Sequence, residues 1–257
     1  MLTDLSGLSG GPDDGGVASA DGAPGGDGGD GGDGGVQDDA VARDASGCAR
    51  YPGAAFCVDF DKTGDLTPST WSSIETTSPS RTIALTTTAP LSPPNAVVLD
   101  LQDAVAGQCK YLRLRKQFTG GATRTSVHFA VRASTAAVPM TIDFKVTDTL
   151  SFSLLVALSK PTQVHFFLQQ NDSSTITEVG SADVELTAPV LDRWLEMTME
   201  YTSQPSNVAT LTVGAEKLTI PVPANLVGHD PEIGFGPYCA NGPTRFAFDD
   251  IAAYLVP

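Results

Sequence analysis

The chain has 257 residues, a formal net charge of −15, four cysteines and 7% aromatic residues. This acidic balance leaves no basic patch that could offset phosphate repulsion, which argues against a nucleic-acid partner. No run of about 18 apolar residues occurs, so the sequence predicts no membrane-spanning helix.

Residues 1–47 differ sharply in composition from the rest of the chain. They hold ten Asp, no Glu, one Arg and 15 of the 26 glycines, with an Asp/Gly tract over 25–35. Such a segment has too little apolar surface, and too much like charge, to offset the entropy lost on ordering. The tract also lacks the apolar residue that each period of a calcium-binding nonapeptide repeat requires. We therefore predict a disordered acidic linker over 1–47 and one folded domain over 48–257.

All four cysteines fall in the predicted domain, as Cys48, Cys57, Cys109 and Cys239. No Cys-x-x-Cys pair and no His at ligand spacing accompanies them, which disfavours zinc. An even count suits two disulfides in an oxidising compartment, with buried free thiols as the alternative. Of the three possible pairings we favour Cys48–Cys57 with Cys109–Cys239. We expect an extracellular or cell-surface protein, although no secretion signal is visible and the start is interpreted as truncated or mis-assigned.

From Tyr51 onward, short runs alternate apolar and polar residues with a period of two. They cover 55–60, 96–101, 111–118, 124–132, 140–146, 150–158, 163–169, 175–179, 193–201, 208–213, 217–222, 232–235 and 245–255. No stretch of ten residues has an apolar period of 3.6, and β-branched and aromatic residues are frequent. The pattern predicts an all-β fold, a two-sheet antiparallel jelly-roll sandwich.

Four short segments carry a family resemblance. They are Asp192-Arg193-Trp194, the "ATLTVG" of 209–214, the "IGFG" of 233–236 and the "FAFDDI" of 246–251. Together they resemble the laminin-G-like, concanavalin A-like lectin/glucanase superfamily. The opening "FCVDF" of 56–60 is similar to the first strand of such domains in bacterial cell-surface proteins. The resemblance implies a buried core position for Trp194, and it leaves function open because the fold hosts lectins, hydrolases, lyases and adhesion modules.

The resemblance also implies that the first and last strands are neighbours, often with a structural calcium ion between them. The carboxylates available there are Asp59, Asp61, Asp249 and Asp250. Calcium takes six to eight oxygen ligands, which these side chains and backbone carbonyls would supply. The alternative is that Asp59 and Asp249 only flank strand ends.

Candidate ligand-binding residues come from two patterns. Tyr111, Arg113 and Arg115 alternate on one predicted strand, and His128 lies between Arg124 and Arg132 on the next. On adjacent strands these side chains would line one face and either bind a ligand or serve a lyase, unless the basic residues only keep an exposed strand soluble. The aromatic residues Trp71 and Tyr238 are predicted platforms for sugar rings. His165 and His229 are interpreted as isolated.

The sequence favours binding over catalysis. No glucanase Glu-x-Asp-x-x-Glu strand occurs, and the carboxylate pairs 183/185 and 196/200 are interpreted as solvent-facing sides of half-buried strands. We expect a monomeric, tethered, bacterial extracytoplasmic module that binds a polysaccharide or surface glycoconjugate. The alternatives are a structural or adhesion domain with protein partners and, less favoured, a polysaccharide lyase or hydrolase.

Overall fold

The computed structural model describes residues 47–172, 174–203, 205–226, 229–240 and 242–257. The predicted linker lies outside these residues except for Gly47, so its boundary with the folded domain stays a prediction. In the described part of the chain, no helix is both long enough and apolar enough to cross a membrane.

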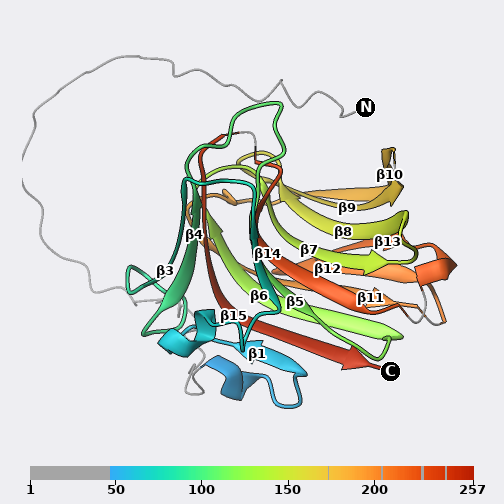
Figure 1. Ribbon diagram of the computed structural model, residues 1–257, viewed down its shortest axis with the longest axis horizontal. Helices are drawn as coiled ribbons and strands as arrows, with labels where there is room; N and C mark the ends of the chain where they lie inside the picture. Colours follow the sequence, from blue (N-terminus) through green and yellow to red (C-terminus); the bar gives the residue numbers. More distant parts are fainter. Residues whose placement is uncertain (1–46, 173, 204, 227–228, 241) are drawn as a thin grey trace, which may run out of the picture. The chain divides into compact units, whose positions relative to one another are not determined.

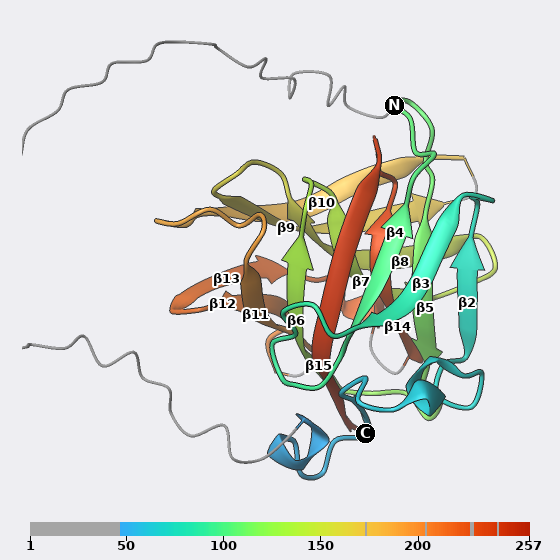
Figure 2. The same cartoon turned by 90° about the vertical axis from the view of Figure 1, so that its left-hand side faces the viewer.

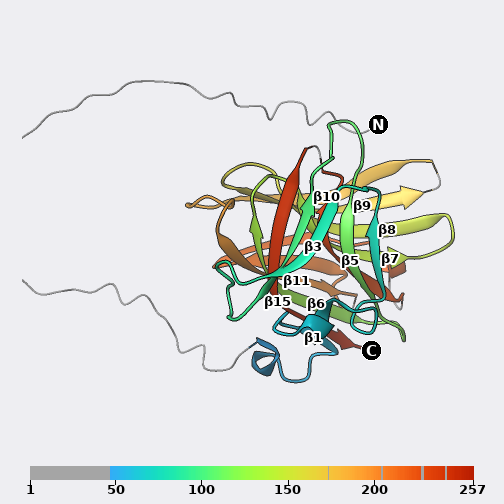
Figure 3. The same ribbon diagram turned by 60° about the vertical axis from the view of Figure 1, so that its left-hand side comes forward.

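The described residues form two antiparallel sheets, seen from three directions in Figures 1, 2 and 3. The eight-stranded sheet consists, in spatial order, of β13 (Glu216–Pro221), β12 (Val208–Val213), β11 (Trp194–Thr202), β6 (Arg124–Ala133), β15 (Thr244–Val256), β4 (Ala96–Leu101) and β3 (Arg81–Thr86), with β1 (Phe56–Val58) paired to β15. The seven-stranded sheet consists of β10 (Ile176–Glu185), β9 (Gln163–Asp172), β8 (Leu150–Leu158), β7 (Val138–Lys145), β14 (Pro231–Tyr238), β5 (Leu112–Gln117) and β2 (Ser73–Thr76). These sheets confirm the predicted all-β, two-sheet sandwich.

The helical segments that the structure describes are short 3-10 turns, η1 (Gly47–Arg50), η2 (Thr63–Leu66) and η3 (Ala224–Leu226). Strand alternation explains the rest of the fold. On β11, for example, Leu195, Met197 and Met199 are buried in the core, while the residues between them face outward. Met197 pairs directly with Phe129 of β6, whose apolar side is also buried. The core therefore lies between the inner faces of the two sheets.

Two strands, β2 and β3, were not predicted. Both are edge strands of their sheets, and most of their side chains are exposed or half-buried. The apolar/polar contrast that reveals a buried strand is weak there, because few side chains of these strands are buried. β10 is also longer than predicted, because a bulge between Glu178 and Gly180 interrupts its alternation.

Strands that are distant in the sequence lie side by side at both ends of the chain. β1 pairs with β15 through Cys57 and Ala252, which confirms that the first and last strands are neighbours. Figure 2 shows β15 between β6 and β4, and β14 likewise lies between β5 and β7 of the other sheet.

Both predicted disulfides are present, with the pairing that we favoured. Cys48–Cys57 closes a short loop at the start of the domain, and Cys109–Cys239 joins segments 130 residues apart. The described residues contain no free cysteine. Two disulfides are compatible with an extracellular protein.

Candidate functional site

Four of the predicted ligand residues lie together on the outer face of the seven-stranded sheet. Leu112 and Leu114 are buried in the core, so Tyr111, Arg113 and Arg115 point to the opposite side. Tyr238, at the end of β14, lies on the same side, because the Arg113 guanidinium carbon is 4.8 Å from its ring centre.

The two arginines belong to one ion-pair network across four strands. Arg115 pairs with Glu75 of β2 and Glu232 of β14. Arg113 crosses β14 and places Nη1 3.3 Å from the Asp143 carboxylate of β7, while Nη2 lies 3.5 Å from Glu75. The Arg113 side chain is only 8% exposed, so these partners offset much of its desolvation. Each guanidinium is therefore neutralised by carboxylates of neighbouring strands.

Gly234 makes room for the crossing of Arg113. A Cβ at this position would lie 2.9 Å from Thr141 Oγ1 and 3.3 Å from Arg113 Nη1. Arg113 Nη1 donates a hydrogen bond of 3.1 Å to the same Thr141 hydroxyl. The missing side chain of Gly234 thus lets Arg113 lie across β14 and reach β7.

A disulfide holds the two tyrosines of this cluster near each other. Tyr111 and Tyr238 have ring centres 6.2 Å apart, and the Arg113 guanidinium lies within 5.8 Å of both. Cys239 follows Tyr238 directly and Cys109 lies two residues before Tyr111, and their disulfide is next to a backbone bridge between Lys110 and Ala240. Burial raises the pKa of the Tyr238 hydroxyl. The pair forms an aromatic platform on strands that are covalently joined.

A second polar cluster lies at the other side of the same face, on β9 and β10. His165 Nδ1 is 2.9 Å from the Asp183 carboxylate, and His165 Nε2 is 3.6 Å from the Glu178 carboxylate. The imidazole stacks on Phe167 with a centroid distance of 4.7 Å. His165 is therefore not isolated, and that interpretation of the sequence was wrong. Its partners lie on a strand whose full length and register the sequence pattern did not reveal.

A continuous row of residues connects the two clusters. Gly234 pairs with Thr141, Thr141 with Leu155, Leu155 with Phe167 and Phe167 with Ser181. Gln169 and Ser153 pair in the adjacent row. Seven strands spaced by about 4.8 Å span roughly 29 Å of surface. The outer face of the seven-stranded sheet thus spans both clusters, with Thr141, Leu155 and Phe167 buried between them.

His128 lies on the other sheet and does not join the arginines. It faces outward from β6 of the eight-stranded sheet, where its ring is 4.9 Å from that of Tyr51. Its Nδ1 hydrogen-bonds with the Thr198 hydroxyl. Burial lowers the pKa of His128, since the cation loses hydration there. The predicted grouping of His128 with Arg113 and Arg115 was wrong, because period-two alternation does not tell which sheet a strand joins.

Both tryptophans differ from their predicted positions. Trp71 is 1% exposed and packs in the core against Phe56, Phe60 and Phe235, so it offers no platform to a ligand. Trp194 is half-buried on the outer side of β11, and its Nε1 donates a hydrogen bond to the Ala89 carbonyl. Trp194 is thus not a core residue, because its neighbour Leu195 takes the inward position.

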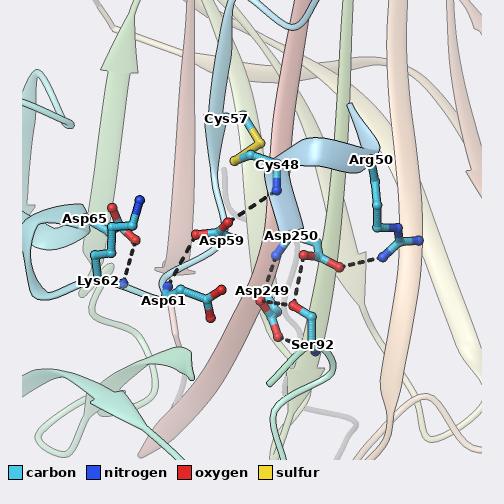
Figure 4. The surroundings of a disulfide bond; sticks show 10 residues. All are labelled: Cys48, Arg50, Cys57, Asp59, Asp61, Lys62, Asp65, Ser92, Asp249 and Asp250. Atoms are coloured by element: carbon cyan, nitrogen blue, oxygen red, sulfur yellow. Dashed lines mark hydrogen bonds and ion pairs between the residues drawn. A yellow bond between two sulfur atoms is a disulfide. The ribbon is translucent and has the colours of Figure 1, made fainter. Parts of the chain in front are cut away.

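The four predicted calcium ligands lie near the junction of β1 and β15 (Figure 4). Asp59 accepts hydrogen bonds from the backbone nitrogens of Cys48 and Asp61. Asp249 accepts bonds from the nitrogen and hydroxyl of Ser92 and from the nitrogen of Asp250.

Asp250 completes this group through an ion pair. It is fully buried, and its Oδ2 lies 2.7 Å from Arg50 Nη1. Burial and the neighbouring charge of Asp250 raise the pKa of Asp249 to about 7. The described residues contain no group of three or more His, Cys, Asp or Glu arranged to hold a metal ion. Asp59, Asp249 and Asp250 already accept hydrogen bonds or an ion pair from protein groups, whereas Asp61 keeps a buried carboxylate oxygen without a hydrogen-bond partner. The predicted structural calcium at these carboxylates stays a prediction.

Comparison with known proteins finds similar solved structures but no match among protein families or curated sequences. A cellulose-induced protein, Cip1, is 13% identical, with a TM-score of 0.46 over 71% of this chain and 91% of its own. A Bacillus subtilis protein of unknown function with a galectin-like fold is 8% identical, with a TM-score of 0.46 over 74% and 94%. The PL7 alginate lyase AlyA1 from Zobellia galactanivorans is 9% identical, with a TM-score of 0.44 over 64% and 79%. Values this low assign no activity, and the fold rests on the strand order described above.

Proposed function

We propose that this protein is an extracytoplasmic binding module that holds a glycan or other cell-surface polymer on the outer face of its seven-stranded sheet. The observation that carries the proposal is the composition of that face. A tyrosine platform and an ion-pair network lie at one side of the face, and a His/Phe/carboxylate cluster lies at the other, with a row that includes Thr141 and Leu155 between them. Aromatic rings that stack on sugars, next to fixed polar groups that orient hydroxyls, are what a polysaccharide site needs.

The rest of the proposal follows from the sequence. The Asp/Gly-rich residues 1–47 would serve as a flexible, self-repelling tether that separates the domain from its attachment. The two disulfides suit an oxidising environment outside the cytoplasm. We expect a monomer that binds through one face.

The test is a polysaccharide array probed with the oxidised full-length protein, with calcium and with a chelator. We expect retention on one class of polymer, and loss of that retention in the double variant Tyr111→Ala/Tyr238→Ala. Tyr254→Ala is the matched control, because Tyr254 is a half-buried tyrosine on the outer side of the other sheet.

Three other results would change the proposal. No retention of a folded, thiol-free protein would overturn it and favour the adhesion role. Equal loss of binding in the Tyr254→Ala control would place the site elsewhere. Release of product from the retained polymer would make the protein an enzyme.

A further inference from the structure

The edge strands of the two sheets differ in how well they are protected against pairing with another strand. β10 contains a bulge and three carboxylates, and β13 contains Glu216, Lys217 and a terminal Pro221. β2 is four residues long and β1 is three, which leaves little backbone to pair. Bulges, charged side chains, proline and short length are the features that keep the edges of sheets from joining other strands.

β3 lacks these protective features after its first residue. Its sequence, "RTIALT", has no proline and no glycine, and Arg81 is its only charged residue. Its pairing with β4 runs over all six residues without a bulge, and β4 is its only partner among the strands of the described residues. The free edge of β3 therefore presents a row of backbone donors and acceptors that another extended strand can bind.

Apolar side chains lie partly uncovered at the same end of the sandwich. Ile83 and Leu85 of β3 pair with core residues of β4, so they face the interior, yet both are only half-buried. Ile74 of β2, the edge strand of the other sheet, pairs with the core residue Leu114 and is 44% exposed. Figure 2 shows β2 and β3 at the same end of the two sheets. A strand added to β3 would cover part of this apolar surface as well as the backbone edge.

A second copy of the chain provides a strand that matches this edge. Two β3 strands related by a two-fold axis perpendicular to the sheet pair antiparallel, so the same edge serves both copies. With the axis near Ala84, Arg81 of one copy lies opposite Thr86 or Thr87 of the other, and like charges do not meet. Ile83 and Leu85 of both copies then share the interior side of one continuous sheet.

We propose that the free edge of β3 is a self-association surface, through which two copies join their eight-stranded sheets. This inference goes beyond the proposed binding of a glycan and does not depend on it. It replaces the monomer expected from the sequence, in which β3 was not recognised as a strand. The tyrosine platform lies on β5 and β14, close to β2, so the dimer would hold two platforms near its axis. A polymer that reaches both platforms would be retained more strongly than by a single copy.

The experiment measures the mass of the oxidised full-length protein by analytical ultracentrifugation over a wide range of concentrations. We expect the mass to rise from one chain to two as the concentration increases. Ala84→Lys places a lysine on the exposed outer side of β3, where the lysines of two copies repel each other across the axis. It should raise the dissociation constant of the dimer by about tenfold or more.

Thr219→Lys is the matched control. It adds the same charge to the exposed outer side of β13, a protected edge strand of the same sheet, and should leave the dissociation constant unchanged. Both variants make the acidic chain less negative, which on its own would favour association. A weaker dimer in Ala84→Lys alone therefore reports on the edge of β3 and not on the overall charge.

Amide hydrogen exchange of the wild type locates the contact independently of the variants. The amides of β3 should exchange more slowly at concentrations where the dimer forms. This measurement decides the question even if Ala84→Lys fails to fold.

A mass of one chain at every concentration overturns the inference. A dimer that both lysine variants weaken equally also overturns it, as does one whose slowed amides lie on β10 or β13. Each of these results leaves the proposed binding face to its own test on the polysaccharide array.

Discussion

Gly234 and Gly236 lie two residues apart on β14, and an added methyl group would meet a different obstacle at each. At Gly234 the obstacles are side-chain atoms of Thr141 and Arg113, and the backbone angle suits any residue. At Gly236 the φ is +125°, and a Cβ would lie 2.1 Å from the backbone oxygen of Leu112. Side chains can move aside, whereas a backbone carbonyl in a sheet cannot.

We therefore expect Gly234→Ala to fold, with a loss of about 1 to 2 kcal/mol in unfolding free energy and weaker ligand binding, because Arg113 is displaced. Gly236→Ala should lose at least about 4 kcal/mol or fail to fold. Urea unfolding and the polysaccharide array measure the two effects. Equal stability of both variants would contradict this account of β14.

Asp249 should make the stability of the domain depend on pH. Its carboxyl is protonated in both states below the ordinary pKa of 3.8. Between there and about pH 7 only the unfolded chain releases the proton, so the folded state becomes less favourable as the pH rises. The loss is on the order of 4 kcal/mol, and it is complete above the raised pKa.

The measurement is urea unfolding of the wild type and Asp249→Asn between pH 4 and pH 8. We expect the wild type to lose stability relative to the variant as the pH rises to 7, with no further change above it. The exposed Glu216→Gln is the control and should run parallel to the wild type. A parallel profile for Asp249→Asn would mean that Asp249 titrates normally.

Single residues also show where sequence patterns reach their limit. Alternation correctly placed Arg113 and Arg115 on one side of a strand, and Met197 and Phe129 in the core. It cannot say which outer face a residue occupies, so His128 was grouped with the wrong sheet. The family resemblance implied a core position for Trp194, but Leu195 takes the inward position of β11, and Trp71, predicted as a platform, is buried in the core.

At the scale of elements, the turn η1 is attached to the eight-stranded sheet by a mostly buried ion pair. Arg50 lies on η1 and Asp250 on the bulge of β15, where a φ of +50° turns the carboxylate toward it. Figure 4 shows this ion pair. Tyr51, the residue after Arg50, packs its ring 4.9 Å from that of His128. Removing one partner leaves a fully buried charge alone, which is more costly than removing both.

We expect Arg50→Met to cost about 3 kcal/mol of unfolding free energy and Asp250→Asn to restore most of it in the double variant. Asn also tolerates a positive φ. Arg124→Met, which breaks the exposed pair with Glu200, should cost less than about 1 kcal/mol. Additive effects in the Arg50/Asp250 double-mutant cycle would show that the two groups do not interact.

Most interior strands could be predicted from the sequence, since 96–101, 150–158 and 208–213 have the predicted bounds. The edge strands could not, because β2 and β3 bury too little surface to impose a pattern. The candidate site depends on strand partners. Arg113 meets Asp143 only because β14 lies between β5 and β7, and β14 follows them by many residues in the chain. Such long-range order is set by the packing of the whole sandwich.

At the scale of the whole molecule, the two disulfides should contribute unequally to stability. Cys109–Cys239 closes a loop over a separation of 130 residues, and Cys48–Cys57 closes one over 9. The loss of chain entropy in the unfolded state corresponds to about 5 and about 3 kcal/mol, respectively.

We expect Cys109→Ser/Cys239→Ser to lower the urea midpoint more than Cys48→Ser/Cys57→Ser. The first variant should also weaken ligand binding, since the disulfide joins the strands of the tyrosine platform. A larger stability loss in the second variant would indicate that attachment of η1, and not loop closure, governs the contribution of the disulfides.

The places of β14 and β15 have a consequence for how the protein is made. Each of these last two strands lies in the interior of its sheet, between strands formed much earlier in the chain. While the C-terminal segment is still being synthesised, β4 and β6 cannot be joined, nor can β5 and β7. The polypeptide must therefore wait as an unfinished chain until its final residues emerge, a state that a translocation channel for unfolded polypeptides would accept. A ribosome stalled shortly before residue 231 should hold a protease-sensitive nascent chain.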